Sequence, residues 1–202
     1  MAAERSGRRA ADVKLVAVSK KQPREAIAEA VDAGQRDFGE NYVQELSAKA
    51  TALASTAIRW HFIGHLQRNK ARALLDVPAL ALIHGVDSVS LAKALDKGRA
   101  AIDVLLQVNV SGERSKSGCT PDALSEILDA PLSRVRVVGL MTMPPEGDDP
   151  RPHFAQLRML RERHGGAARL PELSMGMSQD YEVAIEEGAT LVRVGSAIFG
   201  DR

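Results

Sequence analysis

Eight short runs rich in β-branched and apolar residues alternate along the chain with amphipathic runs rich in Ala, Leu and Glu. The run at 102–110, "IDVLLQVNV", is almost continuously apolar, which is typical of a parallel strand covered on both faces. This alternation predicts an α/β fold built on a parallel sheet. We expect strands at residues 13–19, 36–41, 59–64, 81–87, 102–110, 136–143, 172–178 and 191–200.

The segments between these strands carry helix signals. Pro23 suits the first position of a helix and Gly34 suits the residue after its end. Ser88 is a suitable N-cap for the run that follows it. We expect helices at residues 23–34, 43–54, 69–75, 89–98, 121–130, 154–164 and 179–189.

Eight strands with helices between them match a (β/α)₈ TIM barrel at the short end of its length range. The competing architecture, a doubly wound open sheet, usually has fewer strands and a glycine-rich turn after the first one. The turn here is "SKKQP", which contains no glycine. We therefore expect one barrel domain over residues 13–202, preceded by a mobile tail at residues 1–12.

Composition excludes several classes of function. The formal net charge of the 202 residues is only +1, and aromatic residues make up 3%, so neither a basic nucleic-acid surface nor a base-stacking platform is expected. No apolar run approaches the roughly 20 residues that span a bilayer. The one cysteine, Cys119, is interpreted as an inert loop residue and permits no internal disulfide. These features favour a cytoplasmic protein without nucleic-acid or membrane partners.

The barrel architecture indicates where function should lie, because TIM-barrel sites form at the C-terminal ends of the strands. Polar residues occupy seven of the eight expected strand ends, so a polar site is expected at that rim. The residues at these ends are Lys20, Asn41, His65, Asp87, Asn109, Met143, Ser178 and Ser196.

Lys20, in "LVAVSKKQP", follows the first expected strand directly. A deprotonated lysine amine can attack an aldehyde, and Lys21 could supply a neighbouring cation that favours the deprotonated form. A lysine that extends from a strand end into solvent is the alternative, and position alone favours it.

The segments "SMGMSQD" and "VRVGSAIFG" lie at the ends of the last two expected strands, where TIM barrels often bind phosphate. Ser178 could N-cap the next helix and offer its hydroxyl, while Gly195 allows close approach and Ser196 adds a hydroxyl. A plain cap and a bend relieved by glycine are the alternative interpretation. Arg193 could pair with a carboxylate or face a ligand.

Three further features have two interpretations each. Asn41 could cap a helix or contact a ligand. The segment 111–118 could form a lid over the site, although a flexible surface loop is more common. His61 and His65 are expected on the same strand face, with His84 elsewhere in the chain. Because no carboxylate set accompanies these histidines, no metal site is expected.

The ordered motifs "LVAVSK", "FGENYVQE", "WHFIGHLQRNK", "VNVSGERSKSG", "GLMTMPP" and "ELSMGMSQDYEVAIEEGATLVRVGSAIFG" resemble the YggS/PROSC family of pyridoxal phosphate (PLP) homeostasis proteins. The resemblance extends over nearly the whole chain from Val13. It implies a single PLP-binding (β/α)₈ barrel over residues 13–202, similar to the N-terminal domain of alanine racemase, the type III fold of PLP proteins. It also implies pyridoxal 5′-phosphate held as an aldimine.

The resemblance assigns roles to individual residues. Lys20 matches the Schiff-base lysine. By the same motifs, the phosphate-binding positions are Ser178, Gly195 and Ser196, the arginine near the cofactor is Arg193, the residue near the ring is Asn41, and looser matches are Met175 and His65.

A PLP carrier that buffers the cofactor and delivers it to apo-enzymes is the function that the resemblance implies, without a clear catalytic reaction. An arginine at the pyridine nitrogen would keep that nitrogen unprotonated, and racemisation would need a second base, for which only Tyr42 and Tyr181 offer tyrosines. A weak PLP-dependent amino-acid racemase remains the alternative, and a Schiff-base aldolase is a more remote one. We expect a monomer.

Overall fold

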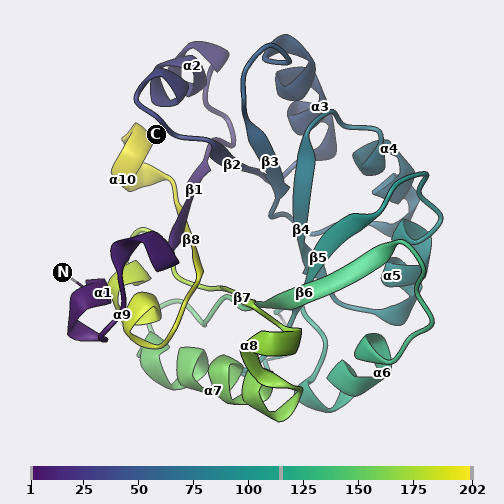
Figure 1. The fold of residues 1–202 in the computed structure, drawn as a ribbon, viewed down its shortest axis with the longest axis vertical. Helices are drawn as coiled ribbons and strands as arrows, with labels where there is room; N and C mark the ends of the chain where they lie inside the picture. Colours follow the sequence, from purple (N-terminus) through teal and green to yellow (C-terminus); the bar gives the residue numbers. More distant parts are fainter. Residues whose placement is uncertain (1, 114–115, 201–202) are drawn as a thin grey trace.

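The computed structural model describes residues 2–113 and 116–200, within which eight parallel strands form a closed barrel. Figure 1 shows the strands following one another around the barrel with the helices outside them. The expected (β/α)₈ barrel is confirmed. The strands are β1 (Lys14–Val18), β2 (Asp37–Glu40), β3 (Arg59–Phe62), β4 (Leu80–Val86), β5 (Ile102–Gln107), β6 (Val135–Met141), β7 (Glu172–Ser174) and β8 (Leu191–Val194).

Helices follow the strands, and side-chain caps fix several of their starts. Ser88 caps α5 as expected, because its hydroxyl accepts a hydrogen bond from the Leu91 N–H. None of the helices in the described ranges is both long enough and apolar enough to cross a membrane. The α-helices are α1 (Ala2–Arg5), α2 (Arg24–Asp32), α3 (Val43–Ala52), α4 (Ala71–Leu75), α5 (Val89–Leu95), α6 (Leu124–Leu128), α7 (Pro150–Arg163), α8 (Gly166–Arg169), α9 (Tyr181–Glu186) and α10 (Ser196–Phe199). Three 3₁₀ turns are η1 (Ala10–Asp12), η2 (Arg68–Lys70) and η3 (Pro121–Ala123).

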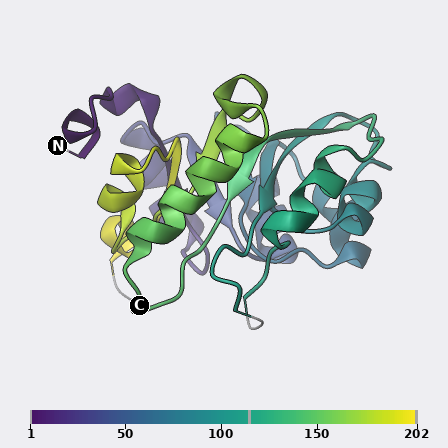
Figure 2. The ribbon, with the colours of Figure 1, turned by 90° about the horizontal axis from the view of Figure 1, so that it is seen from below.

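The N-terminal segment packs against α9 at one end of the barrel, where Figure 2 shows it in purple. Its alanines Ala2 and Ala3 are buried. Arg5 donates hydrogen bonds to the carboxylates of Glu182 (2.7 Å) and Glu186 (2.8 Å). Two small apolar side chains and an ion-paired arginine thus attach this segment to the barrel, and its mobility stays a prediction.

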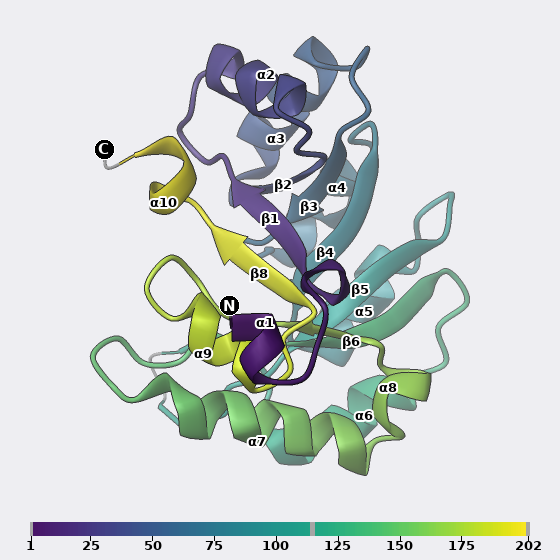
Figure 3. The ribbon, with the colours of Figure 1, turned by 60° about the vertical axis from the view of Figure 1, so that its left-hand side comes forward.

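The barrel closes where its first and last strands pair. Val16 lies beside Arg193 and Ala17 beside Val194 in this parallel ladder, which Figure 3 shows as β1 next to β8. Because all eight strands are parallel, their C-terminal ends lie on one rim. Residues near position 20 and residues near position 195 are therefore neighbours in space.

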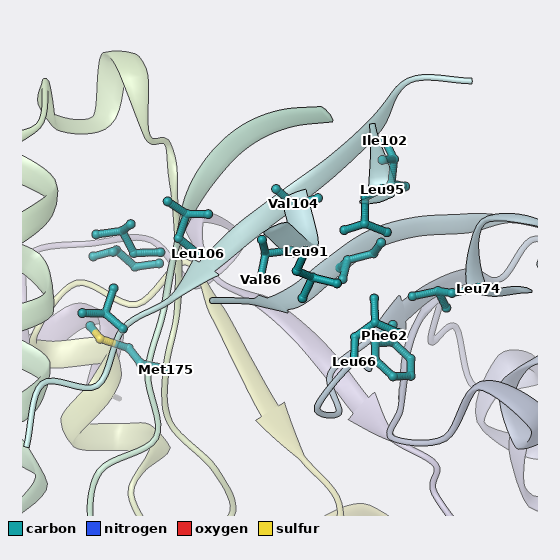
Figure 4. Packing of buried hydrophobic residues seen from close by; sticks show 14 of the residues in the cluster. Phe62, Leu66, Leu74, Val86, Leu91, Leu95, Ile102, Val104, Leu106 and Met175 are labelled. Carbon is teal, nitrogen blue, oxygen red and sulfur yellow. The ribbon is translucent and has the colours of Figure 1, made fainter. Parts of the chain in front are cut away.

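Two apolar layers fill the fold. The smaller lies inside the barrel and consists of Val16, Leu82, Leu105, Met141 and Leu191. The larger lies between the strands and the surrounding helices, and Figure 4 shows part of it, with Leu91 and Leu95 of α5 near side chains of β4 and β5. Neighbouring strand residues thus point alternately to these two layers, as the strand pleat requires.

All eight strands end earlier than the sequence suggested, and the difference is largest for the last two. The last runs only to Val194, because its partner β1 ends at Val18 and the final paired residues are Ala17 and Val194. The apolar residues that follow form α10 instead. The seventh strand ends at Ser174, and Gly176 then adopts a φ of +92°, a left-handed conformation that favours glycine and turns the chain.

Candidate cofactor site

A cavity of about 380 Å³ opens at the C-terminal rim of the barrel, beside the β1–β8 junction. Six of the eight site residues expected from the sequence line it: Lys20, Asn41, Ser178, Arg193, Gly195 and Ser196. They follow or belong to β1, β2, β7 and β8. The barrel therefore brings together residues that are up to 176 positions apart, from Lys20 to Ser196.

The other two expected residues do not line this cavity. The side chain of His65 is 60% exposed, and its Nδ1 lies 4.0 Å from Oδ2 of Asp87. Because β3 ends at Phe62, His65 lies beyond the strand, and the expectation that it shares a face with the buried His61 is wrong. Met175 is fully buried in the larger apolar layer, where Figure 4 labels it.

Lys20 sits in a turn at the end of β1. The Ser19 N–H donates to the Gly39 carbonyl at 3.0 Å, and the Gln22 N–H donates to the Ser19 carbonyl at 3.0 Å. Lys21 has a φ of +60°, which is uncommon for a residue with a side chain. This turn ends the strand and leaves Lys20 half-buried in the cavity wall.

The buried ion pair of Glu40 and Lys49 holds that turn through Ser19. The Ser19 hydroxyl donates to Oε1 of Glu40 at 2.7 Å. The Lys49 ammonium donates to the same oxygen at 2.7 Å and to the Ser19 carbonyl at 2.7 Å. Burial raises the pKa of Glu40, and the hydrogen bonds from Lys49 and Ser19 oppose that rise. The turn that carries Lys20 is thus tied to β2 and α3.

The loops after β7 and β8 are joined through Ser178, whose hydroxyl accepts a hydrogen bond from the Gly195 N–H at 3.4 Å. The expectation that Ser178 caps the next helix is wrong, because α9 starts at Tyr181 and Asp180 occupies the cap position. Ser196 opens α10, and the first N–H groups of a helix have no partner within that helix. Hydroxyls and free N–H groups of this kind suit phosphate oxygens.

Arg193 lies at the inner wall of the cavity and is 4% exposed. Its Nη1 donates to the Ser174 hydroxyl at 2.6 Å, and its Nη2 donates to the Thr142 carbonyl at 3.1 Å. Burial lowers the pKa of Arg193 to about 10, so the side chain stays charged at neutral pH. A guanidinium has five N–H donors, so donors remain for a ligand. Both of its partners are neutral, which leaves a buried cation facing the cavity.

Asn41 also contributes a polar atom to the cavity wall. Its Oδ1 is buried and has no hydrogen-bond partner among the described residues. The helix cap alternative does not apply, because Tyr42 is the N-cap of α3. Gly64 packs closely here, since a Cβ at that position would lie 2.1 Å from the Asn41 carbonyl oxygen. Because this acceptor lies at the cavity wall, it is available to a ligand bound there.

Sequence reasoning missed the remaining lining residues, which are Val18, Gln22, Ile63, Met143, Met177 and Gly200. Strand alternation could have indicated Val18, because it lies two positions before Lys20. Met143 was expected at the rim but without a ligand role. Met143 and Met177 line the cavity from segments that follow strand ends, and no sequence pattern predicts which loop residues will line a cavity.

A second cavity of about 610 Å³ adjoins the first, and the two share Met143, Met177, Ser178 and Ser196. Lys116 and Ser117 line it, whereas residues 114–115 of the expected lid lie outside the described residues. Asn109 organises the start of this loop, because its Oδ1 accepts from the Gly112 N–H at 3.1 Å. The role of the loop as a lid stays a prediction.

Metal and thiol chemistry find no support in the described part of the chain. No group of three or more His, Cys, Asp or Glu side chains there could hold a metal ion. Cys119 is buried, and burial raises the pKa of its thiol to about 11. A thiol that stays protonated at neutral pH is a poor nucleophile.

A family model described as "Alanine racemase, N-terminal domain" matches residues 3–202. The chain therefore belongs to the class of barrels that this model describes. An alanine racemase from Corynebacterium glutamicum shares the fold, with a TM-score of 0.70 at 22% identity, covering 100% of this chain and 58% of that one. A protein from Aquifex aeolicus called "Pyridoxal phosphate homeostasis protein" is 45% identical over 100% of this chain and 92% of its own length. The chain therefore belongs to the family of pyridoxal phosphate homeostasis proteins.

One solved structure of a relative shows a cofactor. PipY of Synechococcus elongatus, described as having PLP bound, superposes with a TM-score of 0.84 at 38% identity. The similarity covers 99% of this chain and 100% of that one.

Proposed function

We propose that this protein binds pyridoxal 5′-phosphate in the 380 Å³ cavity and serves in PLP homeostasis, buffering the cofactor and delivering it to apo-enzymes. The observation that carries the proposal is that an amine, Lys20, and a buried cation, Arg193, line the same cavity. The family names and the PLP reported in PipY agree with this assignment.

The residues present fit the chemical groups of the cofactor. PLP supplies an aldehyde, which reacts reversibly with amines. Lys20 provides the amine, the Ser178–Gly195–Ser196 region provides donors for the phosphate, and Arg193, which lines the same cavity, would donate toward the pyridine nitrogen. The unpartnered Oδ1 of Asn41 adds an acceptor at the wall. The cavity volume lies within the range usual for small-ligand sites.

Reversible attachment suits delivery better than turnover. Lys20 would supply the amine that holds the aldehyde reversibly, and a competing amine could displace it. A guanidinium at the pyridine nitrogen would keep that nitrogen unprotonated, which would weaken the cofactor as an electron sink. We propose that residues 13–202 form the binding unit, that the protein acts as a cytoplasmic monomer, and that apo PLP-dependent enzymes receive the cofactor.

Lys20→Ala is the direct test. Wild-type protein with PLP should show an absorption band at about 410–430 nm, a property of the amine-bound cofactor, and the variant should lack it. Lys21→Asn is the matched control, because Lys21 is exposed and Asn tolerates its positive φ. The control should keep the band. Transfer is tested by activation of an apo PLP-dependent enzyme after mixing with the loaded protein.

Two results would contradict the proposal. A wild-type protein that gains no band with added PLP would exclude covalent binding. An unchanged band in Lys20→Ala would show that another amine holds the cofactor.

A further inference from the structure

A chain of hydrogen-bonded side chains crosses the inside of the barrel and ends at Arg193. Its members lie on five strands and are all buried: Asp37, His61, His84, Ser174 and Arg193. The bonds are His61 Nε2 to Asp37 Oδ1 (3.0 Å), His61 Nδ1 to His84 Nε2 (2.9 Å), His84 Nδ1 to Ser174 Oγ (2.8 Å) and Arg193 Nη1 to Ser174 Oγ (2.6 Å).

The Asp37 end of this chain holds a negative charge. Burial raises the pKa of Asp37, but the hydrogen bonds from His61 and Arg59 outweigh burial and hold the pKa well below its usual range. Two guanidinium nitrogens of Arg59 donate to the carboxylate, and the Arg59 side chain is 60% exposed. Since Arg59 and Asp37 begin β3 and β2, this end lies away from the cofactor rim.

One direction of the protons gives every group in this chain a donor or acceptor that matches its neighbour. An ionised Asp37 can only accept, so Nε2 of His61 carries hydrogen, and Nδ1 of His61 accepts when Nε2 of His84 carries hydrogen. His84 Nδ1 then accepts from the Ser174 hydroxyl. Ser174 in turn accepts from Arg193, which can only donate. All donors therefore point from Arg193 toward Asp37.

The reverse orientation leaves a group unsatisfied. If His84 Nδ1 carried hydrogen, Ser174 would face two donors, His84 and Arg193, and its own hydroxyl hydrogen would have no acceptor in the chain. Unsatisfied buried donors are costly. Burial is the largest cause that lowers the pKa of His84 well below its usual value, which is consistent with a neutral ring.

We propose that His84 and Ser174 are positioning residues that orient the Arg193 guanidinium toward the PLP ring, through a proton-ordered chain anchored at Asp37. Without the Ser174 acceptor, the Thr142 carbonyl would be the remaining hydrogen-bond partner of Arg193 among the described residues, and the plane of the guanidinium would no longer be fixed. This inference rests on the proposed function, because it assumes that PLP occupies the cavity beside Arg193.

Three variants test the proposal. His84→Leu breaks the chain with a side chain of similar size. His84→Gln restores it, because an amide oxygen can accept from Ser174 while the amide nitrogen donates to His61. Ser174→Ala removes the acceptor for Arg193 with little change in volume, and it serves as the test if His84→Leu does not fold. Each protein is titrated with PLP, followed by absorption spectroscopy, and the melting temperature is measured without cofactor.

We expect His84→Leu and Ser174→Ala to bind PLP about tenfold more weakly, since the lost contact is a hydrogen bond to a charged group. Their absorption maximum should also shift, whereas His84→Gln should approach wild type in both respects. Wild-type affinity and spectrum in Ser174→Ala would overturn the proposal. Equal losses in His84→Leu and His84→Gln would overturn the proton order. A wild-type protein that binds no PLP would instead contradict the proposed function.

Discussion

At the scale of single residues, the charge of Glu40 depends on one neighbour. The Glu40 side chain is fully buried, and Lys49 is the cation that bonds to it. Its other carboxylate oxygen, Oε2, has no partner among the described residues. The pair also holds the Ser19 turn that precedes Lys20. Removal of the lysine would leave a buried carboxylate without a counter-ion, which is costly to the folded state.

We therefore predict that Lys49→Met destabilises the protein by about 3–5 kcal/mol at neutral pH. The folded-state pKa of Glu40 is raised already and should rise further in the variant. A folded state that binds a proton more readily than the unfolded state gains stability as the pH falls through this raised pKa. The deficit should shrink between pH 8 and pH 5 in chemical denaturation, and a deficit independent of pH would contradict the prediction.

The cavity residues at the C-terminal rim could be predicted from the sequence, but the buried hydrogen bonds inside the barrel could not. Lys20, Arg193 and Ser178 could be predicted, because strand ends of a parallel barrel share one rim and the motifs are specific. His61 and His84 could not be linked from sequence. Their contact depends on the register between β3 and β4, which shifts between Trp60 and His61, and no local pattern reports that shift.

At the scale of elements, the turn after β7 depends on glycine for two reasons. Gly176 has a φ of +92°, and a Cβ there would lie 2.6 Å from the Ala184 Cβ of α9. Gly147 is a natural control, because it has a φ of +88° and no atom within 4 Å of an added Cβ. Comparison of the two positions separates backbone strain from packing.

Gly147→Ala should cost about 1 kcal/mol, the penalty of a left-handed conformation. Gly176→Ala should cost about 2–4 kcal/mol, because overpacking against α9 adds to that penalty. Gly176→Ala should also weaken PLP binding, since this turn leads to Ser178 in the cavity wall. Denaturant titrations of both variants measure the difference, and equal losses would show that α9 adjusts without cost.

Element types were more predictable than element ends. Short, nearly continuous apolar runs indicated the strands, because parallel strands are covered on both faces. The helix α10 was missed, since "SAIF" is apolar enough to continue a strand and only the missing β1 partner ends the ladder. Helix α8 was missed as well, because Gly165 and Gly166 precede and begin it.

At the scale of the whole molecule, the tyrosines lie apart from the cofactor cavity. The sequence has two tyrosines, and neither Tyr42 nor Tyr181 is among the residues that line the cofactor cavity. Tyr42 is 53% exposed on the surface. A racemase must remove a proton from one face of its substrate and return it to the other, which needs two positioned groups.

We predict that protein loaded with PLP exchanges the Cα hydrogen of alanine in D₂O no faster than free PLP at the same concentration. Proton NMR of the alanine signal measures the exchange, and the Lys20→Ala variant provides the background. Exchange that is faster in the wild type and absent in the variant would favour the racemase alternative.

The proposed cofactor site needs the closed barrel, because its two main residues lie at the first and last strands, which pair at the β1–β8 junction. Lys20 follows the first strand, Arg193 lies in the last, and β7 meets β8 through a single paired position, Ser174 beside Leu191. A nascent chain that still lacks β8 would contain Lys20 but not Arg193. Fraying of β8 from its neighbours would separate Arg193 from Lys20, so local opening of this strand is expected to weaken cofactor binding.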